Sequence, residues 1–170
     1  GGLLIALART SDNRLVQRLA TVFIQIFQGT PLLMQLFLVF FGAPVVGIEV
    51  SPWVAAGIAL VLNTSAFLGE IWRGSIQAVP SGQLEAAQAL GLPYTERMRW
   101  VVLPQAFKIA LPSTVGYMVQ VIKGTSLAAI IGFTEITRAG QIINNATFEP
   151  LLVFRIVGAI YFALCWPLSF

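Results

Sequence analysis

The chain is poor in the residues that usually carry catalysis and metal binding. Its 170 residues include one cysteine, Cys165, and no histidine. A single cysteine excludes an intrachain disulfide and a thiolate metal site. The lack of histidine removes the commonest metal ligand, proton shuttle and catalytic base. We therefore expect neither a bound metal ion nor a cofactor.

Charged residues are equally scarce. They make up 10% of the chain, against about 25% in an ordinary soluble domain, while hydrophobic residues make up 57%. Three long stretches carry no charge at all: residues 19–48, 109–122 and 156–170. A soluble protein of this length could not cover so much apolar surface. The net charge of +3 indicates basic loops rather than nucleic-acid binding, because no basic patch is interleaved with aromatic residues.

The apolar runs predict an all-α, multi-pass transmembrane bundle. Residues 1–8 are too short to cross a hydrocarbon core of about 30 Å, so we expect them to be the end of an incomplete helix. Four further spans are expected at residues 22–41, 53–72, 106–122 and 151–168. Gly29-Thr30-Pro31 interrupts the first of these, since proline removes a backbone donor and favours a change of helix axis. Residues 127–133 are apolar but too short to cross, which favours a partly embedded segment.

Basic residues set the expected orientation. The group that we place on the cytoplasmic side, following the positive-inside rule, is larger than the group on the opposite side. The cytoplasmic group is Arg9, Arg14, Arg18, Arg73, Arg97, Arg99 and Lys108, and the outer group is Lys123, Arg138 and Arg155. The loop at residues 80–104 then faces the cytoplasm.

Six polar residues in or next to the apolar runs are candidates for a substrate pathway. Lipid would reject such side chains, so we expect them to face the interior of the bundle. They are Gln28, Gln35, Asn63, Gln120, Lys123 and Thr125. For the glutamines, hydrogen bonding between helices explains the pattern as well as a pathway lining does, and both interpretations stay open. For Glu70, an interfacial ion pair with Arg73 is favoured over a gating role.

The polar segment at residues 80–104 predicts two short helices that form a hook. Ser81 is expected to cap a helix over residues 82–90. Gly91 can supply the left-handed residue that ends this helix, and Pro93 suits the first turn of the next one. Thr134 is expected to cap another small helix, which carries Glu135 and Arg138.

Residues of the hook resemble a known signature. Glu85-Ala86-Ala87, Gly91 and Leu103-Pro104 resemble the EAA motif of the membrane subunits of bacterial ABC importers. Further stretches are similar to the polar amino-acid permeases of the histidine/glutamine type. They are Gly29-Thr30-Pro31-Leu32-Leu33, Glu70-Ile71-Trp72-Arg73-Gly74, Pro104-Gln105-Ala106, Leu111-Pro112 and Thr125-Ser126-Leu127.

This resemblance implies a permease subunit of an ATP-driven amino-acid uptake system. It implies a type I importer fold with about five spans in the full subunit, a single transmembrane domain over residues 1–170, and the bacterial cytoplasmic membrane. The implied partners are a separate ATP-binding subunit, a second permease subunit and an extracytoplasmic solute-binding protein. The coupling residues would be Glu85, Ala86, Ala87, Gly91, Leu103 and Pro104. The chain has no G-x-x-x-x-G-K-[ST] phosphate loop, so ATP hydrolysis would reside in the partner.

Two positions depart from the family pattern. Gln28 stands where the family often has arginine before Gly-Thr-Pro, and Gly124 stands where it often has an acidic residue. Either departure could alter substrate preference or mark one subunit of a heteromeric pair. The resemblance does not decide whether the two permease subunits are identical, and it does not name the amino acid.

Two other functions are weaker alternatives. An intramembrane serine hydrolase is suggested by Gly124-Thr125-Ser126-Leu127-Ala128, which nearly matches G-x-S-x-G, with Lys123 as a base for Ser126. The final glycine of that motif is absent. A passive pore would not explain the well-capped polar hook.

Overall fold

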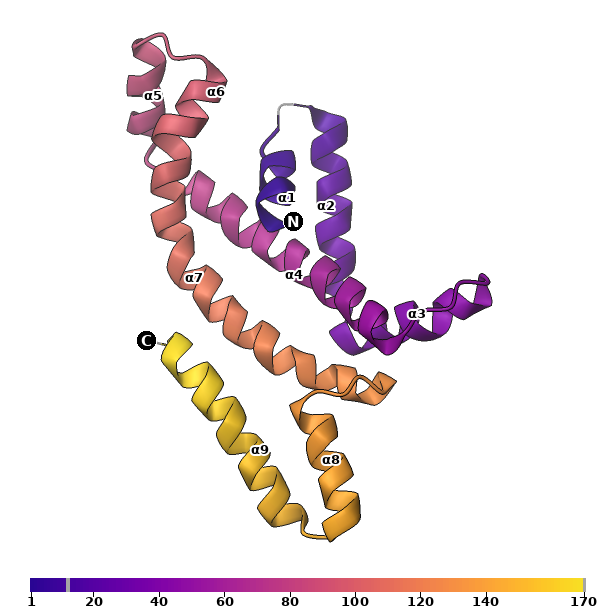
Figure 1. Cartoon of the computed structure of the whole chain (residues 1–170). Coiled ribbons are helices and arrows are strands. Elements are labelled where there is room, and N and C mark those ends of the chain that lie inside the picture. Colours follow the sequence, from indigo (N-terminus) through magenta and orange to yellow (C-terminus); the bar gives the residue numbers. More distant parts are fainter. Residues whose placement is uncertain (12, 170) are drawn as a thin grey trace. The chain divides into compact units, whose positions relative to one another are not determined.

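The computed structural model describes residues 1–11 and 13–169. Most of these residues lie in helices, and none of them lies in a strand. They form two compact units: Gly1–Ile26 with Ser65–Val115, and Phe27–Thr64 with Gly116–Phe170. The helices, labelled in Figure 1, are α1 (Gly2–Arg9), α2 (Arg14–Gly29), α3 (Leu32–Val45), α4 (Pro52–Gln77), α5 (Ser81–Ala89), α6 (Tyr94–Glu96), α7 (Leu103–Gly124), α8 (Ile136–Thr147) and α9 (Pro150–Cys165). The described residues also form a π-helix, η1 (Arg97–Val102), and two 3-10 helices, η2 (Thr125–Ile131) and η3 (Trp166–Ser169).

Within the described residues, three helical stretches are long and apolar enough to cross a membrane: Pro52–Gln77, Tyr94–Ile131 and Pro150–Ser169. α4, with 26 residues, is about 39 Å long at 1.5 Å per residue and exceeds the hydrocarbon core. α2 and α3 pass the same test only together and are bent by 100° at the break, the geometry of a broken span or of a re-entrant loop. The expected all-α, multi-pass fold is confirmed. The change of axis at Gly29-Thr30-Pro31 is confirmed as a complete break between two helices.

In the first unit, α1 crosses the second half of α4 at two glycines. A Cβ atom on Gly2 would lie 2.5 Å from the Cβ of Leu68, and one on Gly69 would lie 2.6 Å from the Cγ2 of Ile5. Small residues let helices approach this closely in a membrane protein. The apolar core of this unit then continues towards the start of α7 with Ala6, Ile76, Val79, Val102 and Ala106.

In the second unit, α3, the first half of α4 and η2 share a core of small and branched side chains. Its buried members are Leu36, Ala55, Ala56, Ala59, Ala128 and Ile131. The ring of Phe133 packs edge-on against Trp53, with 4.9 Å between the ring centroids. The segment that we expected to be partly embedded is therefore a short 3-10 helix, shielded by the protein around it.

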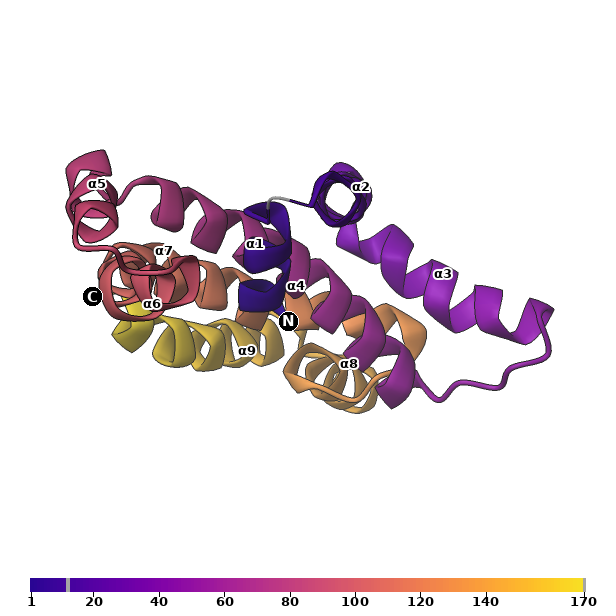
Figure 2. The same cartoon turned by 90° about the horizontal axis from the view of Figure 1, so that it is seen from above.

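The second unit also contains α8 and α9, which run side by side (Figures 1 and 2). They meet at Gly140, where a Cβ atom would lie 2.6 Å from the Cγ2 of Val157. The predicted cap of α8 was wrong by one residue. Glu135, not Thr134, is the N-cap, and its carboxylate accepts the backbone N–H groups of Thr137 and Arg138 at 2.8 Å each. A carboxylate offers two acceptor oxygens to the first turn, and its negative charge is favoured at the N-terminus of a helix.

Candidate functional site

The polar segment at residues 80–104 folds into a hook in which α5 and α6 turn back at the start of α7 (Figure 1). Gly91 has the expected left-handed conformation, with φ of +73°. Its N–H donates to the carbonyl of Gln88 at 2.9 Å, and the N–H of Leu92 donates to that of Ala87 at 3.2 Å. These two bonds form a Schellman motif. The predicted helix end is confirmed.

Both predicted helix starts in the hook were wrong by one residue. α5 begins at Ser81, and the backbone of Pro80 takes the cap position without a side-chain hydrogen bond. Pro93 is likewise the N-cap of α6 rather than its first residue. In both cases the fixed φ of proline sets the extended residue that precedes the helix.

The residues of the EAA motif face in different directions. Glu85 and Ala86 are exposed, whereas Ala87 is 4% exposed and belongs to the interior of the unit. Ala87 therefore supports the hook from within. The next apolar side chain, Leu90, is 79% exposed, and Gly91 beside it is also exposed. Glu85, Ala86 and Leu90 are thus accessible to a partner.

A π-helical turn joins the hook to α7. Pro104 has no backbone N–H to donate into the helix, and η1 is the wider turn immediately before it. The side chain of Gln105 adds a bond at this turn, since its Nε2 donates to the carbonyl of Val101 at 2.9 Å. The same Nε2 lies 3.5 Å from Oε1 of Gln83 on α5. Leu103 packs against the core of this unit, while Pro104 is exposed.

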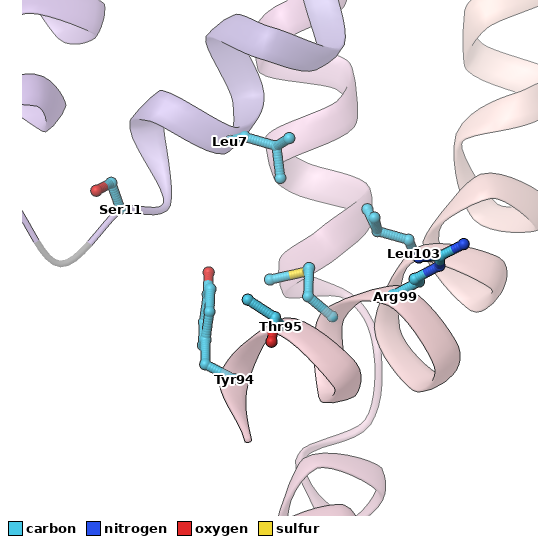
Figure 3. A pocket seen from close by; sticks show the side chains of 7 residues that line it. Leu7, Ser11, Tyr94, Thr95, Arg99 and Leu103 are labelled. Atoms are coloured by element: carbon cyan, nitrogen blue, oxygen red, sulfur yellow. The ribbon is translucent and has the colours of Figure 1, made fainter. Parts of the chain in front are cut away.

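A groove of about 430 Å³ lies beside the hook, between the end of α1 and α6 with η1 (Figure 3). It is lined by Leu7, Ser11, Tyr94, Thr95, Met98, Arg99 and Leu103. The guanidinium of Arg99 lies 5.1 Å from the ring centroid of Trp100, which is 68% exposed. The hook therefore presents the cationic side chain of Arg99 and the aromatic ring of Trp100 at the surface beside this groove.

Two of the six pathway candidates, Gln35 and Asn63, are bonded to each other. They are 6% and 7% exposed, and the Nδ2 of Asn63 donates to Oε1 of Gln35 at 3.1 Å. Both also donate to the carbonyl of Phe27 at the end of α2, at 2.9 Å from Gln35 and 3.3 Å from Asn63. For this pair the structure shows hydrogen bonding between helices, one of the two interpretations left open by the sequence.

The other four candidates are more accessible. Gln28, Gln120 and Lys123 are exposed, and Thr125 is half-buried, with its hydroxyl donating to the carbonyl of Ile122 at 2.7 Å. The predicted ion pair between Glu70 and Arg73 is present on α4, where the guanidinium also donates to Gln77.

The structure does not favour the serine hydrolase alternative. The hydroxyl of Ser126 donates to the carbonyl of Lys123 at 2.7 Å, as hydroxyls at helix ends commonly do. Among residues 1–11 and 13–169, no group of three or more His, Cys, Asp or Glu side chains could hold a metal ion.

Sequence reasoning missed two polar residues that the structure connects to these sites. Gln105 ties α7 to the hook, as described above. Tyr117 on α7 donates its hydroxyl to Oδ1 of Asn63 at 3.2 Å. Both lie on α7, a mostly apolar helix in which a polar side chain is expected to find a partner within the protein, but the sequence does not identify that partner.

The fold and the hook define a multi-pass helical membrane protein that carries a folded polar element at the start of a long spanning helix. Residues 1–170 match the family described as binding-protein-dependent transport system inner membrane component, and the chain belongs to this family. Its members are permease components of ABC importers.

Relatives and a solved structure agree with this assignment. The chain is 40% identical to the probable amino-acid ABC transporter permease protein YckA of Bacillus subtilis, with 96% of the chain and 73% of the relative covered. It is 41% identical to the nopaline transport system permease protein NocM of Agrobacterium fabrum, with 97% and 73% covered. A crystal structure of an amino acid ABC transporter with histidines matches with a TM-score of 0.93 and 37% identity, over 99% of this chain and 78% of that one.

Proposed function

We propose that this chain is a membrane-spanning permease subunit that takes part in ATP-driven uptake of an amino acid. The family assignment supports the class of transporter, and the printed names of the relatives support an amino acid as the solute. The observation that carries the proposal is the hook, which is folded, exposed at Glu85 and Leu90, and continuous with the stretch Tyr94–Ile131 that is long enough to span.

The partners follow from the class. ABC importer permeases of this binding-protein-dependent family work with an ATP-binding subunit and a substrate-binding protein. We place a second permease subunit, identical or homologous, beside this one. α9 offers apolar surface to lipid or to such a subunit: Leu151 is 89% exposed and Phe162 is 65% exposed. The chain then forms one transmembrane domain over residues 1–170 of a multi-pass protein in the bacterial cytoplasmic membrane.

In this proposal the hook transmits movement from the ATP-binding subunit to the spanning helix. Glu85 and Ala86 contact a cleft of the ATP-binding subunit, and Ala87, Gly91, Leu103 and Pro104 hold the shape that presents them. Small side chains permit close approach, and the carboxylate of Glu85 can accept hydrogen bonds from the partner. When the ATP-binding subunits close, they draw the hook with them and move the spanning helix that it begins.

The solute pathway is lined in this proposal by the accessible candidates Gln28, Gln120, Lys123 and Thr125. Their amide, ammonium and hydroxyl groups can replace the water around a zwitterion. Gln35 and Asn63 support the pathway from behind, since their polar atoms are already bonded within the protein.

Reconstitution tests the proposed function. The chain is purified with the subunits that accompany it in its native host and placed in liposomes containing ATP. Uptake of a panel of labelled amino acids is then measured with and without the substrate-binding protein. We expect uptake that requires ATP, the binding protein and the complete complex. Nucleotide-independent flux through this subunit alone would contradict the proposal and favour a passive pore.

A further inference from the structure

A chain of buried hydrogen bonds closes the break between α2 and α3. Because the helix stops at Gly29, carbonyls at the end of α2 have no partner in the next turn. The Nε2 of Gln35 donates to the carbonyls of Phe27 and Thr30, at 2.9 and 3.1 Å, and lies 2.9 Å from the Thr30 hydroxyl. Asn63 adds a second donor to Phe27. Side chains of α3 and α4 thus replace the missing helical donors.

The chain of bonds has a direction. Both N–H groups of Asn63 are used as donors, towards Phe27 and Gln35, and those of Gln35 point towards Phe27 and Thr30. The Oδ1 of Asn63 is left as the acceptor for the Tyr117 hydroxyl at 3.2 Å. Turning either amide over would place oxygen against oxygen. The carbonyls of Phe27 and Thr30 can only accept, so they fix the orientation of both amides and leave Oδ1 of Asn63 facing Tyr117.

Such a chain favours two discrete arrangements over a gradual deformation. An unpaired polar group is strongly disfavoured in a membrane interior, so the loss of one bond in the chain favours rearrangement of the other bonds. Broken helices in transporters place their ends at the solute pathway, and Gln28, a pathway candidate, lies in the last turn of α2. The bonds that hold the break therefore also position the backbone next to the pathway.

Tyr117 brings this chain of bonds to the helical stretch that begins with the hook. That stretch, Tyr94–Ile131, is uninterrupted. We propose that the hydroxyl of Tyr117 is a positioning group that links movement of the hook to the break between α2 and α3 through Asn63 and Gln35. Tyr117 acts on the solute pathway through the break and does not touch the solute. This inference rests on the proposed function, because it needs an ATP-driven hook.

The test is the coupling ratio of the Tyr117→Phe variant. The complete transporter, with its ATP-binding subunits and binding protein, is reconstituted in liposomes, and solute uptake and ATP hydrolysis are measured in the same preparation. We expect hydrolysis close to that of the unmodified transporter, while uptake per ATP falls about five- to tenfold, the factor that one lost hydrogen bond represents. A merely structural role would lower both rates together, in proportion to the amount of intact protein.

Ser75→Ala is the matched control. Ser75 is a buried residue of the spanning helix α4, and its hydroxyl donates to the carbonyl of Ile71 at 2.9 Å, outside this chain of bonds. We expect its uptake per ATP to stay within about twofold of the ratio of the unmodified transporter. This change is smaller than the factor expected for the loss of one hydrogen bond. An unchanged ratio in Tyr117→Phe, or an equal fall in both variants, would overturn the proposal.

A double-mutant cycle gives a second, independent measurement. Asn63→Ala, Tyr117→Phe and the double variant are compared. We expect the coupling ratio of the double variant to be no lower than that of Asn63→Ala, because both changes remove the same hydrogen bond between Tyr117 and Asn63. Multiplicative effects, or proportional loss of uptake and hydrolysis in all three variants, would overturn the link. Failure of the unmodified transporter to hydrolyse ATP or take up any amino acid would instead contradict the proposed function, so the two failures are distinguishable.

Discussion

The side-chain amide of Asn63 on α4 donates to the side-chain oxygen of Gln35 on α3 across 3.1 Å, and both residues are more than 90% buried. Each amide also reaches the backbone at the end of α2. Two amides 28 residues apart therefore hold the break between α2 and α3. This pair makes the interruption at Gly29-Thr30-Pro31 a fixed element of the structure rather than a weak point.

Replacing Gln35 should destabilise this region markedly. Gln35→Leu removes both donors to the break and the acceptor of Asn63, and intramembrane bonds of this kind are worth about 0.6–2 kcal/mol each. We expect a total loss on the order of 1–3 kcal/mol, seen as a thermal transition in detergent several degrees lower. Gln25→Leu, an exposed glutamine on α2, serves as control and should leave the transition unchanged. Equal transitions for both variants would show that the buried pair contributes nothing.

The turn of the hook should depend on Gly91. At φ of +73° an alanine pays about 1–2 kcal/mol for the left-handed conformation. We expect Gly91→Ala to loosen α5 and to reduce the stimulation of ATP hydrolysis by the binding protein. Gly82→Ala is the control, because a Cβ there would meet nothing within 4 Å and alanine favours a helix. Limited proteolysis of the hook measures the loosening of α5. Cleavage that is equally slow in Gly91→Ala and Gly82→Ala would contradict the expectation.

The contact between α8 and α9 should not tolerate a side chain at Gly140. In Gly140→Ala the new methyl group would lie 2.6 Å from the Cγ2 of Val157, and valine is stiff about χ1. Overpacking of this kind costs about 1–3 kcal/mol, so we expect a lower thermal transition. Gly158→Ala on α9, where the space is open, should be neutral. A neutral Gly140→Ala would mean that the two helices separate freely.

Much of the architecture could be predicted from the sequence. Uncharged apolar runs locate the spans because the hydrocarbon core sets their length. Gly91 and Pro31 locate a helix end and a helix break because their backbone preferences are local. These features depend on a few neighbouring residues, and the structure confirms them.

Features that depend on distant residues could not be predicted. Thr21, Gln25, Gln28 and Gln35 would share one face of a continuous helix, but the 100° bend removes Gln35 from that face. The pairing of Gln35 with Asn63, and of Asn63 with Tyr117, joins three helices at separations of 28 and 54 residues. The inward direction of Ala87 depends on how α5 packs against η1. Helix caps missed by one residue, as at Ser81 and Thr134, reflect competition between neighbouring residues that can each begin a helix.

The most direct test of the central claim is ATP-driven uptake by the Glu85→Arg variant in the reconstituted complex. Reversing an exposed charge that faces a partner should weaken docking, and we expect uptake to fall at least about tenfold, or 1.4 kcal/mol. Subunit assembly is checked by co-purification, and Glu149→Arg, an exposed carboxylate before α9, should transport normally. Uptake by Glu85→Arg equal to that of the unmodified complex, with normal assembly, would contradict the claim that the hook carries the work of ATP hydrolysis.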